Sequence, residues 1–130
     1  MLPFTLKDIE NKTLSPIKQD DSRATFCRKI KKEDGEVDWN RPAQEILNQI
    51  KALNPWPSTY TEIKGKKLKI LEAMSTPSET KSTPGTIEVL SKEVFGFHTK
   101  DNLLTPTLLQ LEGKSEMTTK EFLNGYRSLL

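Results

Sequence analysis

Cysteine and histidine are nearly absent: the chain of 130 residues has one of each, Cys27 and His98. A single thiol cannot form an internal disulfide, which favours a reducing, cytoplasmic location. One cysteine and one histidine cannot form a zinc site without two carboxylates in support. We therefore expect no disulfide and no metal centre.

Long apolar runs are also missing. No stretch approaches the roughly 20 apolar residues that a membrane-spanning helix needs. The first residues contain neither the basic segment nor the apolar segment of a secretory signal. The sequence therefore predicts no membrane partner, and its length suits one domain with its own core.

Features of an active site are equally scarce. No glycine-rich phosphate loop is present. His98 lies in an expected strand without a neighbouring base or nucleophile, so we expect a surface or half-buried structural residue. Cys27 is expected to be a small packing residue, because a nucleophilic thiol needs a base or an electropositive pocket. We predict no catalytic and no cofactor-binding residue.

Neither sign of charge dominates, because the chain has 20 basic and 18 acidic residues and a net charge of +2. A preference for charged partners must therefore come from local clusters. The first cluster contains Arg28, Lys29, Lys31 and Lys32, and the second contains Lys64, Lys66, Lys67 and Lys69, with Arg41 and Lys51 between them. Composition alone favours solvated faces, and the alternative is phosphate binding with release of counterions.

The clearest periodicity predicts a helix between residues 40 and 54. An apolar stripe at helical spacing contains Ala43, Ile46, Leu47, Ile50 and Leu53. Asn40 is expected to cap this helix and Pro42 to fit its first turn. The helix should end at Asn54-Pro55, since a residue before proline avoids the helical region.

Most of the remaining pattern is β. A hairpin is expected around Lys64-Gly65-Lys66, followed by a loop over 75–85 and strands over 86–90, 94–99 and 103–111. Residues 24–30 are expected to open another strand. A capping box, Thr118 with Glu121, predicts a short C-terminal helix that buries Phe122, Leu123 and Tyr126.

These elements predict a mainly β fold with helices. Five or six short strands, one well-formed helix after the linker and a short C-terminal helix suit an OB-like barrel. Residues 2–14 are expected to form a short, weakly amphipathic helix, and residues 15–23 a linker. We expect residues 1–23 to be the remnant of a preceding domain and residues 24–130 to be the barrel domain.

Several segments, in this order, resemble the C-terminal domain of the methionyl-tRNA formyltransferase family. They are Lys29-Ile30-Lys31-Lys32-Glu33-Asp34-Gly35-Glu36-Val37-Asp38-Trp39, Ala52-Leu53-Asn54-Pro55-Trp56-Pro57, Pro84-Gly85-Thr86-Ile87, Glu112-Gly113-Lys114 and Glu121-Phe122-Leu123-Asn124-Gly125. The related domains of formyltetrahydrofolate dehydrogenase and of sugar formyltransferases share parts of this pattern. Residues 4–14 resemble the last helix of the family's N-terminal domain.

The resemblance implies an OB-like barrel and a role outside the chemical step. The family transfers a formyl group from 10-formyltetrahydrofolate to the methionine on initiator tRNA. Its catalytic Asn, His and Asp, and its folate site, belong to an N-terminal Rossmann-like domain. This chain is therefore expected to lack catalysis of its own and to have that domain and initiator Met-tRNA as partners.

The resemblance also implies that the basic clusters bind tRNA. The residues expected to do so are Arg28, Lys29, Lys31, Lys32, Arg41, Lys64, Lys66, Lys67 and Lys69. Trp39 and Trp56 are expected to pack against the fold rather than to stack on bases. Two alternatives stay open: the C-terminal domain of a folate or sugar formyltransferase, and a split-gene remnant that works only with a separate N-terminal half.

Overall fold

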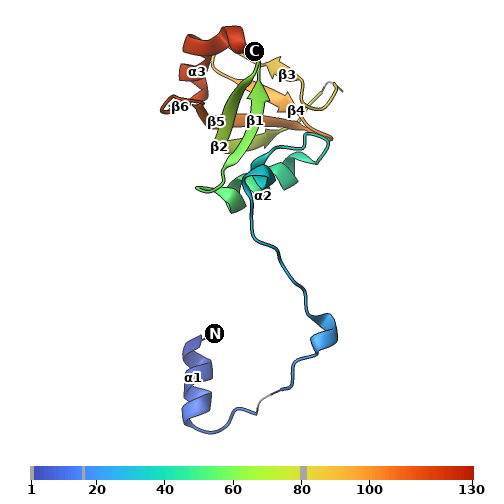
Figure 1. Ribbon diagram of the computed structural model, residues 1–130, viewed down its shortest axis with the longest axis vertical. Helices are drawn as coiled ribbons and strands as arrows, with labels where there is room; N and C mark the ends of the chain where they lie inside the picture. Colours follow the sequence, from blue (N-terminus) through green and yellow to red (C-terminus); the bar gives the residue numbers. More distant parts are fainter. Residues whose placement is uncertain (1, 16, 80–81) are drawn as a thin grey trace.

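A computed structural model describes residues 2–15, 17–79 and 82–130 (Figure 1). Three α-helices, six strands and three short 3-10 helices are present in this part of the chain. In order they are α1 (Leu2–Glu10), η1 (Asp21–Arg23), η2 (Lys32–Gly35), α2 (Ala43–Leu53), β1 (Thr59–Ile63), β2 (Lys66–Thr76), β3 (Ile87–Val89), β4 (Phe95–His98), β5 (Leu103–Leu111), β6 (Glu116–Thr118), α3 (Thr119–Tyr126) and η3 (Arg127–Leu129).

The strands form one antiparallel sheet that curls into a half-barrel, as Figure 1 shows. Its strand order is β1-β2-β5-β4-β3, and β6 pairs with the C-terminal part of β5, from Leu108 to Gln110. The long strand β2 changes register near Glu72, where an irregularity in the pairing with β5 lets the sheet bend. The prediction of a mainly β, OB-like fold is confirmed.

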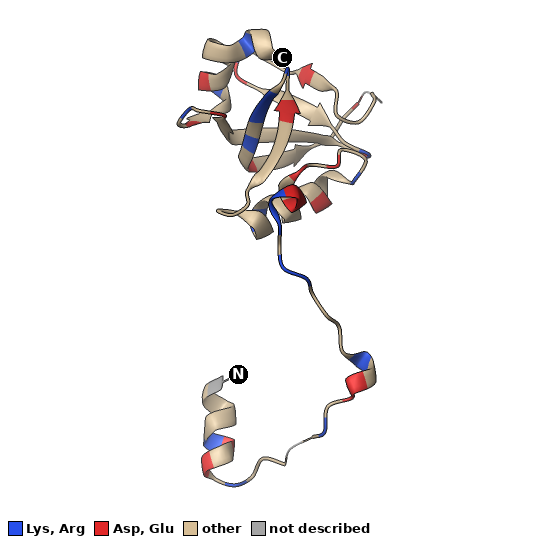
Figure 2. Ribbon diagram, in the orientation of Figure 1, with Lys and Arg blue, Asp and Glu red and all other residues tan. Residues whose placement is uncertain are grey.

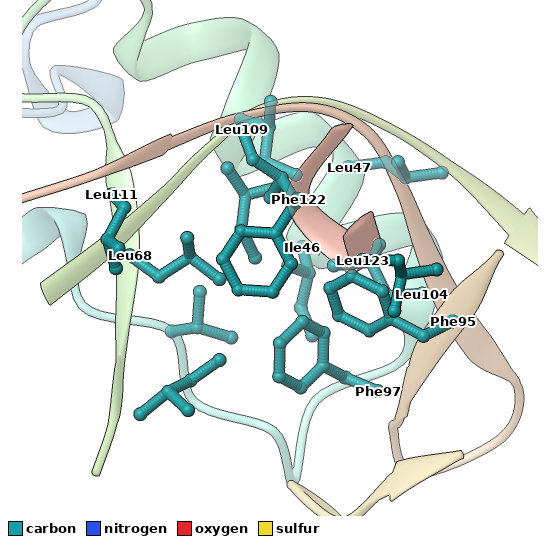
Figure 3. Close-up of a cluster of buried hydrophobic side chains, with 14 residues drawn as sticks. Ile46, Leu47, Leu68, Phe95, Phe97, Leu104, Leu109, Leu111, Phe122 and Leu123 are labelled. Carbon is teal, nitrogen blue, oxygen red and sulfur yellow. The ribbon is translucent and has the colours of Figure 1, made fainter. Parts of the chain in front are cut away.

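The half-barrel is filled by apolar side chains from both the sheet and the helices (Figure 3). Leu68 and Ile70 project inward from β2 because alternate residues of a strand face opposite sides. The apolar stripe predicted for α2 is buried at all five positions. Phe122 and Leu123 of α3 close one end, whereas Tyr126 is only partly buried.

Helix α2 begins differently from the prediction. Pro42, not Asn40, is the residue before its first turn, and its side chain cannot accept a hydrogen bond. Asn40 instead donates to Asp38. The first amide of the helix, that of Ala43, donates to Oδ1 of Asp101 over 2.9 Å. A residue 58 positions away therefore caps α2 and ties it to the β4–β5 turn.

Trp39 closes the seam of the curled sheet between β1, one of its edge strands, and β4, which lies next to the other edge strand. Its ring stacks on Phe97 of β4 at 4.5 Å between centroids, with the planes 18° apart. Its Nε1 donates to Oγ1 of Thr61 on β1 over 3.3 Å. Gly85 allows this approach, because it has φ +88° and a Cβ there would lie 3.1 Å from the indole ring. The expectation that Trp39 packs against the fold is confirmed.

Two predictions about the strands and their loops are wrong. Residues 24–30 form no strand; Phe26 is 97% exposed and Ile30 is 49% exposed, so no neighbouring strand covers them. The loop predicted over 75–85 begins later, because β2 continues to Thr76. Positions 80 and 81 of that prediction lie outside the described residues.

The helices predicted near the two ends of the chain are present in the structure. The capping box of α3 is present, with Thr118 and Glu121 each accepting from the other's backbone amide. Helix α1 falls within the predicted segment, and its Phe4, Leu6 and Ile9 are exposed. Within the described residues no helix is long and apolar enough to cross a membrane.

Replacing Trp39 tests the seam. Trp39→Ala should lower the free energy of unfolding by about 3 kcal/mol, because it leaves a cavity between β1 and β4. Trp39→Phe keeps a stacked ring and should cost about 1 kcal/mol, mainly through the lost hydrogen bond to Thr61. Urea denaturation followed by circular dichroism measures both values, and equal losses would argue against a role for the ring.

The long-range cap can be tested at Asp101. Asp101→Ala should destabilise the protein by about 1 kcal/mol, the usual cost of losing a helix cap. Asp101→Asn keeps an acceptor oxygen and is the matched control. The same denaturation assay, with hydrogen exchange of the Ala43 amide, separates the two variants; unchanged exchange in Asp101→Ala would contradict the cap.

Candidate nucleic-acid interface

In the structure the linker extends beyond residue 23 as far as the sheet, and the first basic cluster lies in this last part of it, visible as blue segments below α2 in Figure 2. Arg28 donates to both carboxylate oxygens of Asp34, over 2.8 Å at Oδ2. The backbone amide of Lys31 also donates to Oδ2, over 2.7 Å. Together these donors lower the pKa of Asp34 to about 2, with the guanidinium as the larger cause. Arg28 is therefore paired, while the side chains of Lys29, Lys31 and Lys32 are exposed.

A buried glycine brings this end of the linker against β1. A Cβ on Gly35 would lie 2.2 Å from the carbonyl oxygen of Ser58, so only glycine fits. One residue later, Glu36 forms a parallel bridge with Tyr60, and the amide of Val37 donates to the Tyr60 carbonyl over 2.9 Å. The linker end therefore runs along the free edge of β1.

The lysines of the second cluster do not all lie together on the surface. Lys67 and Lys69 share the outer face of β2, as their alternation predicts. Lys64 has its Nζ 2.5 Å from the carbonyl oxygen of Ser128, near the C-terminus. Lys66 is exposed at the beginning of β2. Arg41 is paired with Glu45 on α2 over 2.9 Å.

The two clusters lie on opposite sides of β1. Tyr60 pairs with Glu36 on one side and with Lys69 on the other. Neighbouring strands are about 4.8 Å apart, so the linker end and β2 are separated by about 10 Å. The structure therefore brings Lys67 and Lys69 together and sets the linker lysines beyond the edge of the same sheet.

Three residues on this face were not predicted from the sequence. Tyr60 lies under Lys67, whose Nζ is 4.0 Å from the ring centroid. Gln110 of β5 pairs with Lys69, and its amide donates to the Lys114 carbonyl. Lys114 follows the turn at Gly113 and lines the same groove as Lys67 and Lys69. The pairing of β1 with β2 places Tyr60 opposite Lys69, and the pairing of β2 with β5 brings Gln110 and Lys114 to the same face.

The remaining candidate residues, His98, Cys27 and Trp56, are either buried in the fold or exposed on its surface. His98 is 4% exposed, more buried than expected, with Nε2 2.8 Å from the carboxylate of Glu88. Cys27 is exposed, so its predicted packing role is wrong. Trp56 is 56% exposed, which contradicts its predicted packing as well. No cluster of ligating side chains suited to a metal ion occurs in residues 2–15, 17–79 and 82–130.

The Arg28–Asp34 pair makes a prediction about acid titration. The lowered pKa keeps the Asp34 carboxylate charged in acid. Its contribution to stability is therefore complete at pH values above the ordinary aspartate pKa, and it is lost as the pH falls through about 2. Arg28→Gln should move the titration midpoint of Asp34 towards the ordinary aspartate pKa of 3.8. Carboxyl-detected NMR measures the midpoint, and Lys32→Gln is the control. A wild-type midpoint near the ordinary pKa would contradict the pairing.

Solved structures with a similar fold include HypX from Aquifex aeolicus. One HypX variant matches with a TM-score of 0.67 at 19% identity, covering 98% of this chain and 23% of HypX. The HypX complex with tetrahydrofolic acid matches with a TM-score of 0.60 at 21% identity, covering 91% of this chain and 21% of HypX. These similarities concern the fold.

Sequence relatives are more similar. The methionyl-tRNA formyltransferase of Bacillus pumilus is 38% identical over 127 residues, which are 96% of this chain and 40% of the relative. That of Staphylococcus aureus is 35% identical over all of this chain and 42% of the relative. The chain thus spans about two-fifths of these relatives. Residues 29–127 match the family described as formyl transferase, C-terminal domain, and the chain belongs to that family.

Proposed function

We propose that this chain is the tRNA-binding C-terminal part of a methionyl-tRNA formyltransferase. The observation that carries the proposal is the 35–38% identity to enzymes of that name over nearly the whole chain. The exposed lysines of the linker and of β2 support it, because lysines that contact phosphates supply affinity for RNA. Phosphate contacts do not read bases, so we expect weak binding with little sequence preference.

The chemical step would take place on a separate domain. We propose that a Rossmann-like N-terminal domain binds 10-formyltetrahydrofolate and transfers its formyl group to the methionine on initiator tRNA. The position of His98 supports this division, because its side chain is buried and its Nε2 lies 2.8 Å from the carboxylate of Glu88. The barrel would hold the tRNA while the other domain acts on its aminoacyl end.

A second candidate is the C-terminal domain of another formyltransferase. The fold similarity to HypX favours it, since one HypX structure contains tetrahydrofolic acid. In that role the barrel would bind no tRNA and would act only with its own N-terminal half. Binding to initiator tRNA therefore separates the two candidates.

The test is a fluorescence anisotropy titration of the full chain with initiator tRNA at low and moderate salt. Affinity should fall steeply with salt, because each neutralised phosphate adds roughly 0.7–0.9 to the slope of log affinity against log salt. Lys31→Glu with Lys32→Glu should weaken binding and reduce that slope by about 2 if each lysine contacts one phosphate.

The matched control is Lys92→Glu with Lys100→Glu, which changes the net charge equally at exposed positions outside both clusters. No binding at low salt, or binding indifferent to salt, would reject the proposal and favour the second candidate. Equal losses in the two double variants would show that only total charge matters. Mixing the chain with the N-terminal half of a relative and measuring formylation then tests the division of labour.

A further inference from the structure

A glutamine of α2 holds the end of the linker, which leaves the barrel beside that helix (Figure 1). The side-chain amide of Gln49 donates to the carbonyl oxygen of Asp34 over 2.9 Å and to that of Glu36 over 3.0 Å. Gly35, between these two carbonyls, lies against the backbone of Ser58 just before β1. The backbone of the linker end is therefore held from two sides, by α2 and by the residues that lead into β1.

The orientation of the Gln49 amide follows from the groups that it faces. Nε2 donates both hydrogen bonds, while Oε1 is buried and has no hydrogen-bond partner among the described residues. A flipped amide would turn Oε1 towards two carbonyl oxygens, which can only accept hydrogen bonds. A buried acceptor without a partner costs free energy, so the side chain gives up one acceptor in order to hold the linker at two points.

Hydrogen bonds inside the linker extend this hold from Asp34 back to Arg28. The guanidinium of Arg28 donates to the carbonyl oxygen of Lys29 over 3.3 Å and to the carboxylate of Asp34 over 2.8 Å. The amide of Lys31 donates to the same carboxylate over 2.7 Å. Residues 28–37, here called the arm, are therefore tied to one another, and the carbonyls that Gln49 holds tie them to the barrel.

The residues directly before the arm are free of the fold. Phe26 is 97% exposed, and Cys27 is exposed as well. Within the described part of the chain, residues 25–27 form no hydrogen bond. A segment with so few contacts moves more easily than one that is held at several points. We therefore expect the linker to bend before Arg28 and not where it meets the barrel.

We infer that Gln49 is a positioning residue that keeps the arm rigid and so presents Lys29, Lys31 and Lys32 in one fixed arrangement. That these lysines contact initiator tRNA rests on the function proposed above. A rigid arm favours binding, because the RNA does not have to order the backbone that carries the lysines. Gln49 contributes this effect without charge and without touching the RNA.

The test compares two variants of the full chain that have the same chemistry on the same helix. Gln49→Met keeps the length of the side chain and the net charge but removes both donors. Gln44→Met is the matched control, because Gln44 is exposed and its amide donates to Asn48 instead of the linker. Heteronuclear NOE values of the backbone amides should fall at residues 31–34 in Gln49→Met and stay unchanged in Gln44→Met.

The tRNA titration then separates positioning from charge. Gln49→Met should weaken binding about fivefold at every salt concentration, because binding must now order the arm. The slope of log affinity against log salt should stay the same, since the number of lysines is unchanged. A general loss of stability would instead speed hydrogen exchange in the core strands, which should match in the two variants.

Four results decide the inference. A loose arm with weaker binding and an unchanged slope supports it. Unchanged NOE values in Gln49→Met overturn it, and so does a loose arm that binds tRNA as tightly as before. If the unaltered chain does not bind tRNA, the proposed function fails, and the NOE values alone decide whether Gln49 holds the arm.

Discussion

The seam closed by Trp39 is the constraint on which the arrangement of this protein depends. The sheet runs from β1 to β3 through three other strands, and its two outer strands are not paired with each other. Trp39 instead joins β1 to β4, the strand next to β3, through its hydrogen bond to Thr61 and its stack on Phe97. Because Trp39 follows the linker by only a few residues, the contact that closes the half-barrel also holds the basic linker against β1.

Local pairing, rather than net charge, decides which basic residues can meet a ligand. Arg28 is neutralised by Asp34, and Arg41 by Glu45. Lys67 lies over a tyrosine ring and forms none of the salt bridges among the described residues, although Glu62 is opposite in the register. A chain with a net charge of only +2 can therefore present a concentrated positive surface.

Features that depend on near neighbours could be predicted from the sequence, and features that depend on distant partners could not. The stripe of α2 and the capping box of α3 are local and were correct. The cap of α2 was missed because Asp101 comes from a turn 58 residues away. Lys114 was missed because only the pairing of β2 with β5 brings it beside Lys69. Residues 24–30 have strand composition, but no strand among the described residues pairs with them.

The alternation of β2 separates side chains that build the core from side chains that point outward. Leu68 and Ile70 point inward and build the core, whereas Lys67 and Lys69 point outward between them. The two faces can change independently, because side chains on opposite sides of a strand do not contact each other. A shared barrel at 19% identity, as with HypX, therefore carries no information about the outer face. The proposed RNA binding rests on these outward residues, and the fold supplies the spacing between them.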